Sequence, residues 1–233
     1  SNVNFSLGSS DQKVTEFKKK TKSSFIEFPG TVEFASLVKN HNTGLQEIII
    51  QDSDLMVYLV SLKDGIPWKM QIDGQIKGSL DQLDFYKNGK LQYFFSTKNK
   101  LYIIDRLGRD VADFPKMLPS DVRFMGLIDY DRSKNYRFLI SSQNNQIYLF
   151  DKKGNNLSEW GPKKIEKEII RSPQHFKMGG KDYFIVFLAD GAVQVFNRKG
   201  DLLNIFHTKE KKVFSGNFYL ESGMSSTTTY LYY

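Results

Sequence analysis

The stretch "YFFSTKNKLYIIDRLGRDVADFP", residues 93–115, decides the fold. It reads as an apolar strand, a polar turn, a second strand, a glycine turn and a third strand. Two later stretches repeat this pattern, "RFLISSQNNQIYLFDKKGNNLSEWGP" at 137–162 and "YFIVFLADGAVQVFNRKGDLLNIFH" at 183–207. Such recurrence predicts a repeat architecture, in which each unit buries its apolar faces against its neighbours.

The glycine turn sets the period of the repeat. Four glycines, called the anchor glycines below, follow one another at intervals of 43, 46 and 46 residues: Gly65, Gly108, Gly154 and Gly200. A further step of 43 residues back reaches Lys22, in a similar turn that has no glycine. Aromatic side chains stand six residues after most of these positions, at Phe28, Phe114, Trp160 and Phe206, whereas the Gly65 copy has Gln71.

Two of the recurring positions have a predicted structural role. We expect the aromatic side chains to be wedges between neighbouring units. Asp105, Asp151 and Asn197 stand three residues before the later anchors, and a short polar acceptor at that place caps the backbone N–H groups of a turn.

Each complete unit contains four short strand candidates. In the second unit these are "QLDFY", "LQYFFS", "LYIID" and "VADF". The second of them is nearly all apolar in every unit, which indicates that both of its faces are covered. Four antiparallel strands every 43 to 46 residues are typical of a propeller blade, so we predict an all-β fold, a β-propeller of four-stranded antiparallel blades.

About five blades are expected within a single domain, 1–233. The predicted repeat boundaries are 1–30 (partial), 31–79, 80–120, 121–162, 163–210 and 211–233 (partial). Two alternatives remain for the ends. In the first, the N- and C-terminal strands share one blade and close the ring; in the second, the chain is a fragment of a larger propeller. We favour the first because it leaves fewer open strand edges.

Two stretches carry a family resemblance. "LMVYLVSLKDGIPWKMQIDGQI" at 55–76 and "IYLFDKKGNNLSEW" at 147–160 resemble the repeats of PQQ-like, quinoprotein-like propellers, a pattern shared with WD-repeat-like propellers. The quinoprotein dehydrogenases of this superfamily bind PQQ and calcium and carry a vicinal cysteine pair, which this chain lacks. The chain is more similar in character to the cofactor-free outer-membrane assembly lipoproteins. That resemblance implies a scaffold in the bacterial periplasm or cell envelope, without a cofactor.

No residue pattern for catalysis is visible. The chain has no cysteine, which excludes disulfides, thiolate metal sites and cysteine nucleophiles. Its three histidines lie in different repeats without metal-ligand spacing, and no nucleophile elbow, P-loop or dinucleotide motif occurs. We therefore expect no catalytic, cofactor-binding or metal-binding residues, and a non-enzymatic scaffold or protein–protein interaction domain. The alternative is a propeller enzyme or small-ligand binder that uses the central funnel.

Neither a membrane-spanning apolar run nor a signal peptide is visible. Because the chain begins with Ser1 and not with Met, we expect that a native N-terminus has been removed.

The net charge of +7 has a predicted location. In a propeller the first-to-second and third-to-fourth turns of every blade emerge on one face, and about half of the 33 basic residues fall in these turns. Five aspartates offset part of this charge: Asp64, Asp110, Asp131, Asp182 and Asp201. The candidate interaction residues on this face are Lys63, Lys87, Lys90, Arg106, Arg109, Arg132, Lys152, Lys153, Arg198 and Lys199.

Loops between blades form a second expected contact surface, at 114–121, 161–173 and 207–212, which adds Lys163 and Lys164 as candidates. We expect a protein partner first and an anionic membrane surface second. Nucleic acid is the least favoured partner, because the aromatic residues lie in strands and not among the basic turns. The structural alternative is that lysines in tight turns only keep a β-protein soluble.

Overall fold

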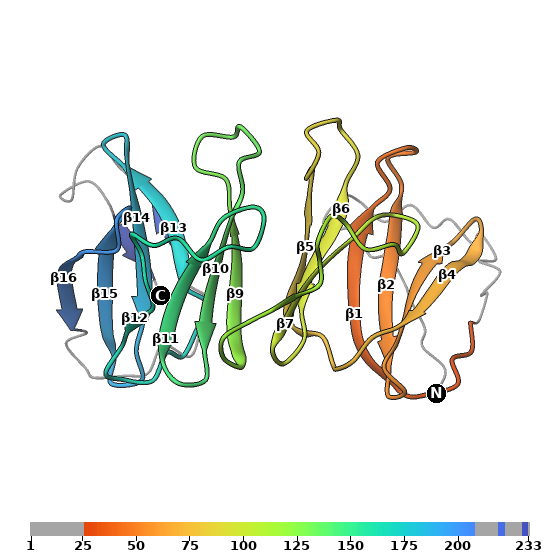
Figure 1. The fold of residues 1–233 in the computed structure, drawn as a ribbon, viewed down its shortest axis with the longest axis horizontal. Coiled ribbons are helices and arrows are strands. Elements are labelled where there is room, and N and C mark those ends of the chain that lie inside the picture. Colours follow the sequence, from red (N-terminus) through yellow and green to blue (C-terminus); the bar gives the residue numbers. More distant parts are fainter. Residues whose placement is uncertain (1–25, 208–218, 222–229, 233) are drawn as a thin grey trace, which may run out of the picture.

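A computed structural model describes residues 26–207, 219–221 and 230–232, and the described part is all-β (Figure 1). Four antiparallel sheets of four strands follow one another along the chain. The first two sheets are formed by β1 (Val32–Lys39), β2 (Gln46–Asp52), β3 (Met56–Ser61) and β4 (Gly65–Gln71), and by β5 (Lys77–Leu83), β6 (Gln92–Ser96), β7 (Lys100–Ile104) and β8 (Lys116–Met117). The third and fourth are formed by β9 (Val122–Ile128), β10 (Arg137–Ser142), β11 (Gln146–Phe150) and β12 (Lys163–Lys164), and by β13 (Gln174–Met178), β14 (Lys181–Phe187), β15 (Ala192–Asn197) and β16 (Leu202–His207).

A small two-stranded sheet, β17 (Tyr219–Glu221) with β18 (Tyr230–Tyr232), completes the described elements. The terminal segments that were expected to share a blade lie mostly outside the described residues, as does the predicted turn copy at Lys22. No helix in the described part of the chain is long and apolar enough to cross a membrane.

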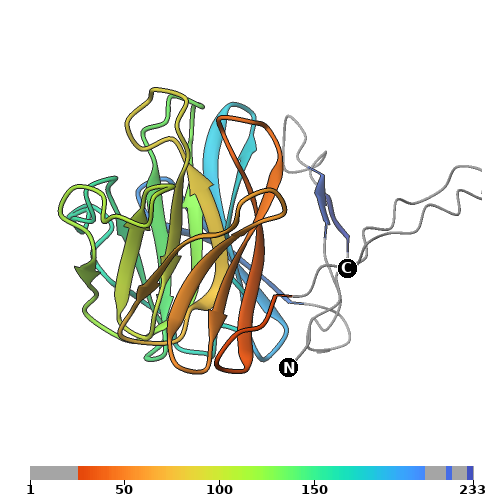
Figure 2. The same cartoon turned by 90° about the vertical axis from the view of Figure 1, so that its right-hand side faces the viewer.

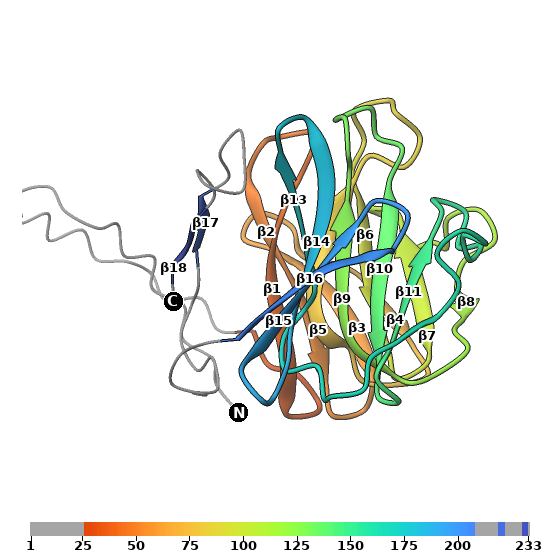
Figure 3. The ribbon, with the colours of Figure 1, turned by 90° about the vertical axis from the view of Figure 1, so that its left-hand side faces the viewer.

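Each of the four sheets is a blade with its strands in chain order, as the repeat predicts. Their apolar faces pack against one another in three clusters. Leu59 and Tyr93 belong to the cluster between the first and second blades, Phe94 and Phe138 to the next, and Phe184 to the cluster between the third and fourth blades. These side chains are almost completely buried because each blade covers the middle strands of the next. Figures 2 and 3 show this stacking from the two ends of the row.

The outer strands differ from the sequence prediction. The stretch "VADF" (111–114) was expected to be the fourth strand of the second blade, but it forms a turn in which the amide of Phe114 donates to Val111 and Ala112 has a φ of 52°. The strand itself is β8, two residues further along, because Pro115 has no N–H to donate to a ladder.

The boundary predicted at residue 163 is also displaced. Lys163 and Lys164 pair with β11, so they belong to the third blade and not to the start of the fourth. Ile165 and Ile169 then fill the core between these two blades, and the fourth blade begins at β13.

Because neighbouring strands run in opposite directions, the turns between them emerge on two opposite faces of the blades. In Figure 1 the first-to-second turns of all four blades point to the top of the picture, and the third-to-fourth turns leave the same ends of the strands. We call this side the turn face, defined by residues 40–45, 62–64, 84–91, 105–110, 129–136, 151–156, 179–182 and 198–201. The opposite face carries the second-to-third turns at 53–55, 97–99, 143–145 and 188–191.

Candidate interaction face

The anchor turns have the predicted geometry. All four anchor glycines have a φ between 70° and 80°, a conformation that disfavours any residue with a Cβ. Asp105 caps its turn by accepting hydrogen bonds from the amides of Leu107 (2.8 Å) and Arg109 (3.0 Å). Asp151 and Asn197 do the same in the next two copies, so the predicted capping role is confirmed.

An aromatic side chain of one blade lies under the anchor glycine of the next. The aromatic residue precedes the glycine by 40 residues in each case: Trp68 with Gly108, Phe114 with Gly154, and Trp160 with Gly200. The indole N–H groups of Trp68 and Trp160 also donate to the carbonyl oxygens of Arg106 (2.7 Å) and Arg198 (2.9 Å). Phe114 and Trp160 are therefore wedges between blades, as predicted. In the first copy, where Gln71 stands at the expected aromatic position, Trp68 is the wedge.

Three of the candidate cations hold neighbouring blades together. They stand two residues before their anchor glycines, and each reaches back to the preceding blade. Arg106 donates to the buried carboxylate of Glu47 at 2.6 Å. Lys152 donates to the carbonyl of Phe85 at 2.5 Å and lies 4.7 Å from the centre of its ring. Arg198 lies 4.3 Å from the ring centre of Tyr130.

These contacts give Arg106, Lys152 and Arg198 a structural role that the sequence did not reveal. Because a cation over an aromatic face or beside a buried carboxylate is held in place, their charges are only partly available to an external partner. Arg109 is similarly engaged, because its guanidinium binds the carboxylate of Asp105 at 2.6 Å.

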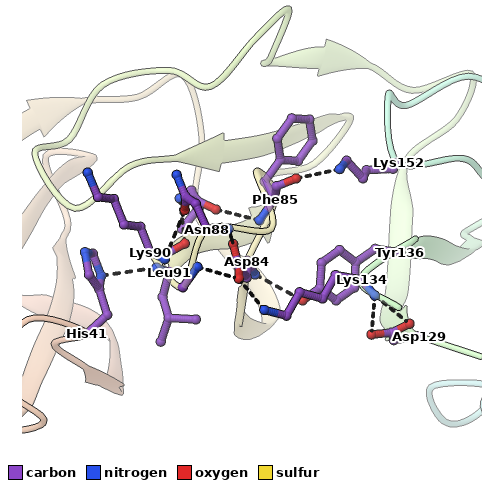
Figure 4. Close-up of polar contacts among 12 residues, drawn as sticks. His41, Asp84, Phe85, Asn88, Lys90, Leu91, Asp129, Lys134, Tyr136 and Lys152 are labelled. Atoms are coloured by element: carbon purple, nitrogen blue, oxygen red, sulfur yellow. Dashed lines mark hydrogen bonds and ion pairs between the residues drawn. The ribbon is translucent and has the colours of Figure 1, made fainter. Parts of the chain in front are cut away.

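Asp84 is the centre of the polar network between the first three blades (Figure 4). Asp84 is 3% exposed, and its carboxylate accepts hydrogen bonds from the amides of Asn88 (2.9 Å) and Gly89 (2.8 Å) and from the ammonium of Lys134 (2.5 Å). Burial raises the pKa of Asp84, but these three donors outweigh it and lower the pKa below the ordinary value. The first-to-second turn of the second blade is thus fixed to that of the third.

His41 makes the corresponding link between the first two blades. Its Nδ1 accepts a hydrogen bond from the amide of Leu91 at 3.1 Å. Burial lowers the pKa of His41, and the positive charges of Arg106 and Lys90 lower it further. Burial and the charge of Lys87 likewise lower the pKa of Lys152. In both groups burial is the larger cause of the lowered pKa, and the neighbouring cations add to it.

The turn face holds more carboxylates than the sequence count included. Asp84, Asp105, Asp129 and Asp151 also lie there, as ion-pair partners and turn caps, and Glu47 lies next to it at the start of β2. Glu47 and Asp84 are buried under the surface. The negative charge therefore lies partly beneath the face, and the cations lie above it.

Six candidate cations are exposed and form no ion pair with any described residue: Lys63, Lys87, Lys90, Arg132, Lys153 and Lys199. Lys87 and Arg132 occupy equivalent turn positions with φ values of 57° and 58°, and Lys87 donates to Asn135 of the next turn at 2.7 Å. Lys163 and Lys164 lie elsewhere, on β12.

Exposed apolar side chains are the feature of the turn face that the sequence reasoning missed. Leu45 (61% exposed), Leu62 (83%), Tyr86 (55%) and Leu107 (58%) all belong to turns of the first two blades. A comparison of the copies could have found two of them. Leu62 stands where the later copies have the capping Asp or Asn, and Leu107 stands where they have Lys153 and Lys199.

A polar hollow of about 410 Å³ lies on the turn face between the third and fourth blades. It is lined by Asp129, Tyr130, Asp131, Arg132, His175 and Lys177. His175 contacts the carboxylate of Asp182 at 2.8 Å. No group of three potential metal ligands gathers within residues 26–207, 219–221 and 230–232.

The chain has a β-propeller fold. A scan against protein-family models and a search of curated proteins gave no match. Among solved structures, BBS1N in complex with ARL6DN is similar, with a TM-score of 0.57, 11% identity and coverage of 80% of this chain. The WD40 domain of Pan2 from Neurospora crassa (TM-score 0.52, 12% identity, 76% of this chain) and BamB from Moraxella catarrhalis (0.50, 16%, 70%) are also similar.

These likenesses concern the fold. The chain spans 58%, 50% and 46% of the three matched chains, respectively. Different propellers share this architecture while their functions lie in individual surfaces, so the function must be argued from the turn face itself.

Proposed function

We propose that this protein is a non-enzymatic propeller scaffold that binds a protein partner through its turn face. The observation that carries the proposal is the arrangement of charge: exposed cations stand on turns that are fixed to one another, over carboxylates that are buried beneath. The turns of this protein lose little conformational freedom when a partner binds, because His41, Asp84 and Arg106 already hold neighbouring turns together.

Two further points support an interaction role. Long-range positive potential steers an oppositely charged partner toward the face and raises the association rate. BBS1N, which has a similar fold, was crystallised in complex with ARL6DN. A location in the bacterial envelope is part of the proposal and rests on the family resemblance alone. Fractionation of the native host tests it, and recovery outside the envelope fractions would refute it.

The experiment for the proposed function is quantitative affinity capture from native host extract with variants on different surfaces. Substitution of three exposed turn-face cations, Lys87→Glu, Lys90→Glu and Arg132→Glu together, should reduce capture of the partner at least about tenfold. Lys98→Glu, which reverses one charge on the opposite face, is the control for that face.

A third variant separates the second expected surface. Lys164→Glu with Lys167→Glu alters β12 of the third blade and the segment that follows it, and both residues are exposed. Loss of capture in this variant or in the Lys98 control, with full capture by the turn-face variant, would refute the turn face as the binding surface.

A further inference from the structure

The exposed apolar residues of the first two blades point to a more specific partner. We propose that an acidic, amphipathic segment of a protein binds across the turns of these two blades, with its apolar side chains on Leu45, Leu62, Tyr86 and Leu107 and its carboxylates on Lys63, Lys87 and Lys90. This inference rests on the proposed function and narrows it to one half of the turn face and to one class of ligand.

The repeat itself shows that the apolar residues are not required by the fold. In the first copy Ser61 caps the anchor turn, because its hydroxyl oxygen accepts hydrogen bonds from the amides of Lys63 (3.3 Å) and Asp64 (3.2 Å). Leu62 is therefore not needed as a cap. The third and fourth copies form the same turn with Lys153 and Lys199 in the place of Leu107. A leucine that is mostly exposed at a turn position where lysine serves equally well contributes no core packing.

The four apolar side chains lie on turns that contacts join into one surface. Strand register pairs Ile48 with Val60, and its continuation brings the chain after β3, with Leu62, beside the start of β2, which follows Leu45. His41 and Leu91 link the first-to-second turns of the two blades, and Arg106 brings the turn of Leu107 to Glu47 at the start of β2. Tyr86 immediately precedes the exposed Lys87 in the same turn.

The charge of this surface selects the partner. Lys63, Lys87 and Lys90 are exposed among the apolar side chains. The exposed carboxylates of Asp64 and Asp110 offset part of this charge, whereas those of Glu47 and Asp84 are buried in ion pairs. Aromatic, leucine and basic side chains together complement a segment in which apolar and acidic residues alternate. The turns of the third and fourth blades carry no large exposed apolar side chain among the described residues, so the same segment has no apolar contact there.

The shape of the surface favours a peptide over a lipid bilayer. In Figure 1 the β1–β2 and β5–β6 turns rise clearly above the β3–β4 turn, which carries Leu62. A flat bilayer reaches the higher turns first, whereas a protein segment can follow the step between the two levels.

Site-specific photocrosslinking in native host extract tests this inference. A photoreactive phenylalanine analogue is placed at Leu62, Tyr86 or Leu107, with Gln143 on the opposite face and Asn155 on the third blade as controls. We expect crosslinks from the three test positions, and not from the controls, to one protein segment with net negative charge and interspersed apolar residues. Crosslinks to lipid, to nucleic acid or to a basic segment would overturn the inference.

A direct binding assay with defined probes provides the second readout. The probes are a fluorescent peptide in which glutamate alternates with leucine, a peptide of equal charge in which serine replaces leucine, and vesicles of phosphatidylserine and phosphatidylcholine. We expect the glutamate–leucine peptide to bind at least about tenfold more tightly than the glutamate–serine peptide. The triple variant Leu62→Ser, Tyr86→Ser, Leu107→Ser should remove that difference. Equal binding of both peptides, or binding of vesicles alone, would refute the inference.

The two levels of the proposal can fail separately. Crosslinks at Asn155 alone would leave a scaffold that binds a protein through another part of the turn face, and would refute the acidic amphipathic segment on the first two blades. Crosslinks at Gln143 alone would place the partner on the opposite face and would refute both. Absence of any protein crosslink from all positions would refute both.

Discussion

The anchor glycines allow the packing between blades to be tested at one repeated position. A methyl group added at Gly108 would lie 2.9 Å from Cδ2 of Trp68, and one added at Gly200 would lie 3.1 Å from Cδ2 of Trp160. At Gly65, which has the same turn conformation with a φ of 70°, the methyl group would meet no atom within 4 Å. Gly65→Ala is therefore a matched control for the backbone effect alone.

The expected magnitudes follow from these distances. A positive φ costs a residue with a Cβ about 1–2 kcal/mol, and alanine recovers part of this by restricting the unfolded chain, so Gly65→Ala should lower the free energy of unfolding by about 1 kcal/mol. Gly108→Ala adds overpacking against the partly buried ring of Trp68. Gly200→Ala adds overpacking against the buried ring of Trp160, besides Lys163 Cε at 2.6 Å. This overpacking costs about 1–3 kcal/mol more. Gly154→Ala should fall between them, because its methyl group meets mainly the flexible side chain of Lys116 at 2.9 Å.

Urea unfolding, followed by circular dichroism, measures this series. The combined variant Trp68→Ala, Gly108→Ala should be less destabilised than the sum of its two single variants, since removing the indole makes room for the methyl group. Equal destabilisation by Gly65→Ala and Gly108→Ala, or strict additivity of the pair, would refute the packing of each anchor turn on the preceding blade.

Three further predictions follow from individual contacts. Trp160→Phe, which places at this position the residue found at Phe114, should cost about 1–2 kcal/mol of unfolding free energy through the lost bond to Arg198, whereas Trp160→Ala should cost about 3–5 kcal/mol; equal costs would contradict the wedge role. Because the pKa of Asp84 is lowered on folding, its contribution to stability is present above the ordinary pKa of 3.8 and is lost as the pH falls through the lowered value. Asp84→Asn should therefore cost about 1–3 kcal/mol at pH 7 and progressively less in acid, with the exposed Asp64→Asn as control; a pH-independent difference would contradict this. The pKa of His41 is also lowered, so its contribution is complete above pH 6.5 and is lost as the pH falls through the lowered value. His41→Gln should remove that part of the pH dependence in denaturant titrations, and an unchanged pH profile would refute the neutral role of His41 in binding the Leu91 amide.

Much of the fold was predictable because the residues that define the repeat act through local contacts. The anchor glycines, the caps at Asp105 and Asp151 and the apolar second strands each act within a few residues of their own position. The outer strands were less predictable. Residues 111–114 are as apolar as a strand, but a turn at Ala112 and the missing N–H of Pro115 shift the pairing to β8.

The site was only partly predictable because its decisive contacts join different blades. Arg106 and Glu47 are 59 residues apart in the chain, and Lys152 and Phe85 are 67 apart. The shared position two residues before an anchor glycine does not reveal these contacts, because Lys63 has the same position and is exposed. The buried carboxylates were overlooked for the same reason. Glu47 lies in a strand and Asp84 at the end of one, and only the packed blades place them under the turn face.

Hydrogen exchange of the protein with its captured partner tests the central claim most directly. We predict slower exchange in the complex at 40–45, 62–64, 84–91 and 105–109, the turns of the first two blades that carry the exposed apolar and basic side chains. Protection confined to 53–55, 97–99 and 143–145, on the other side of the blades, would contradict it.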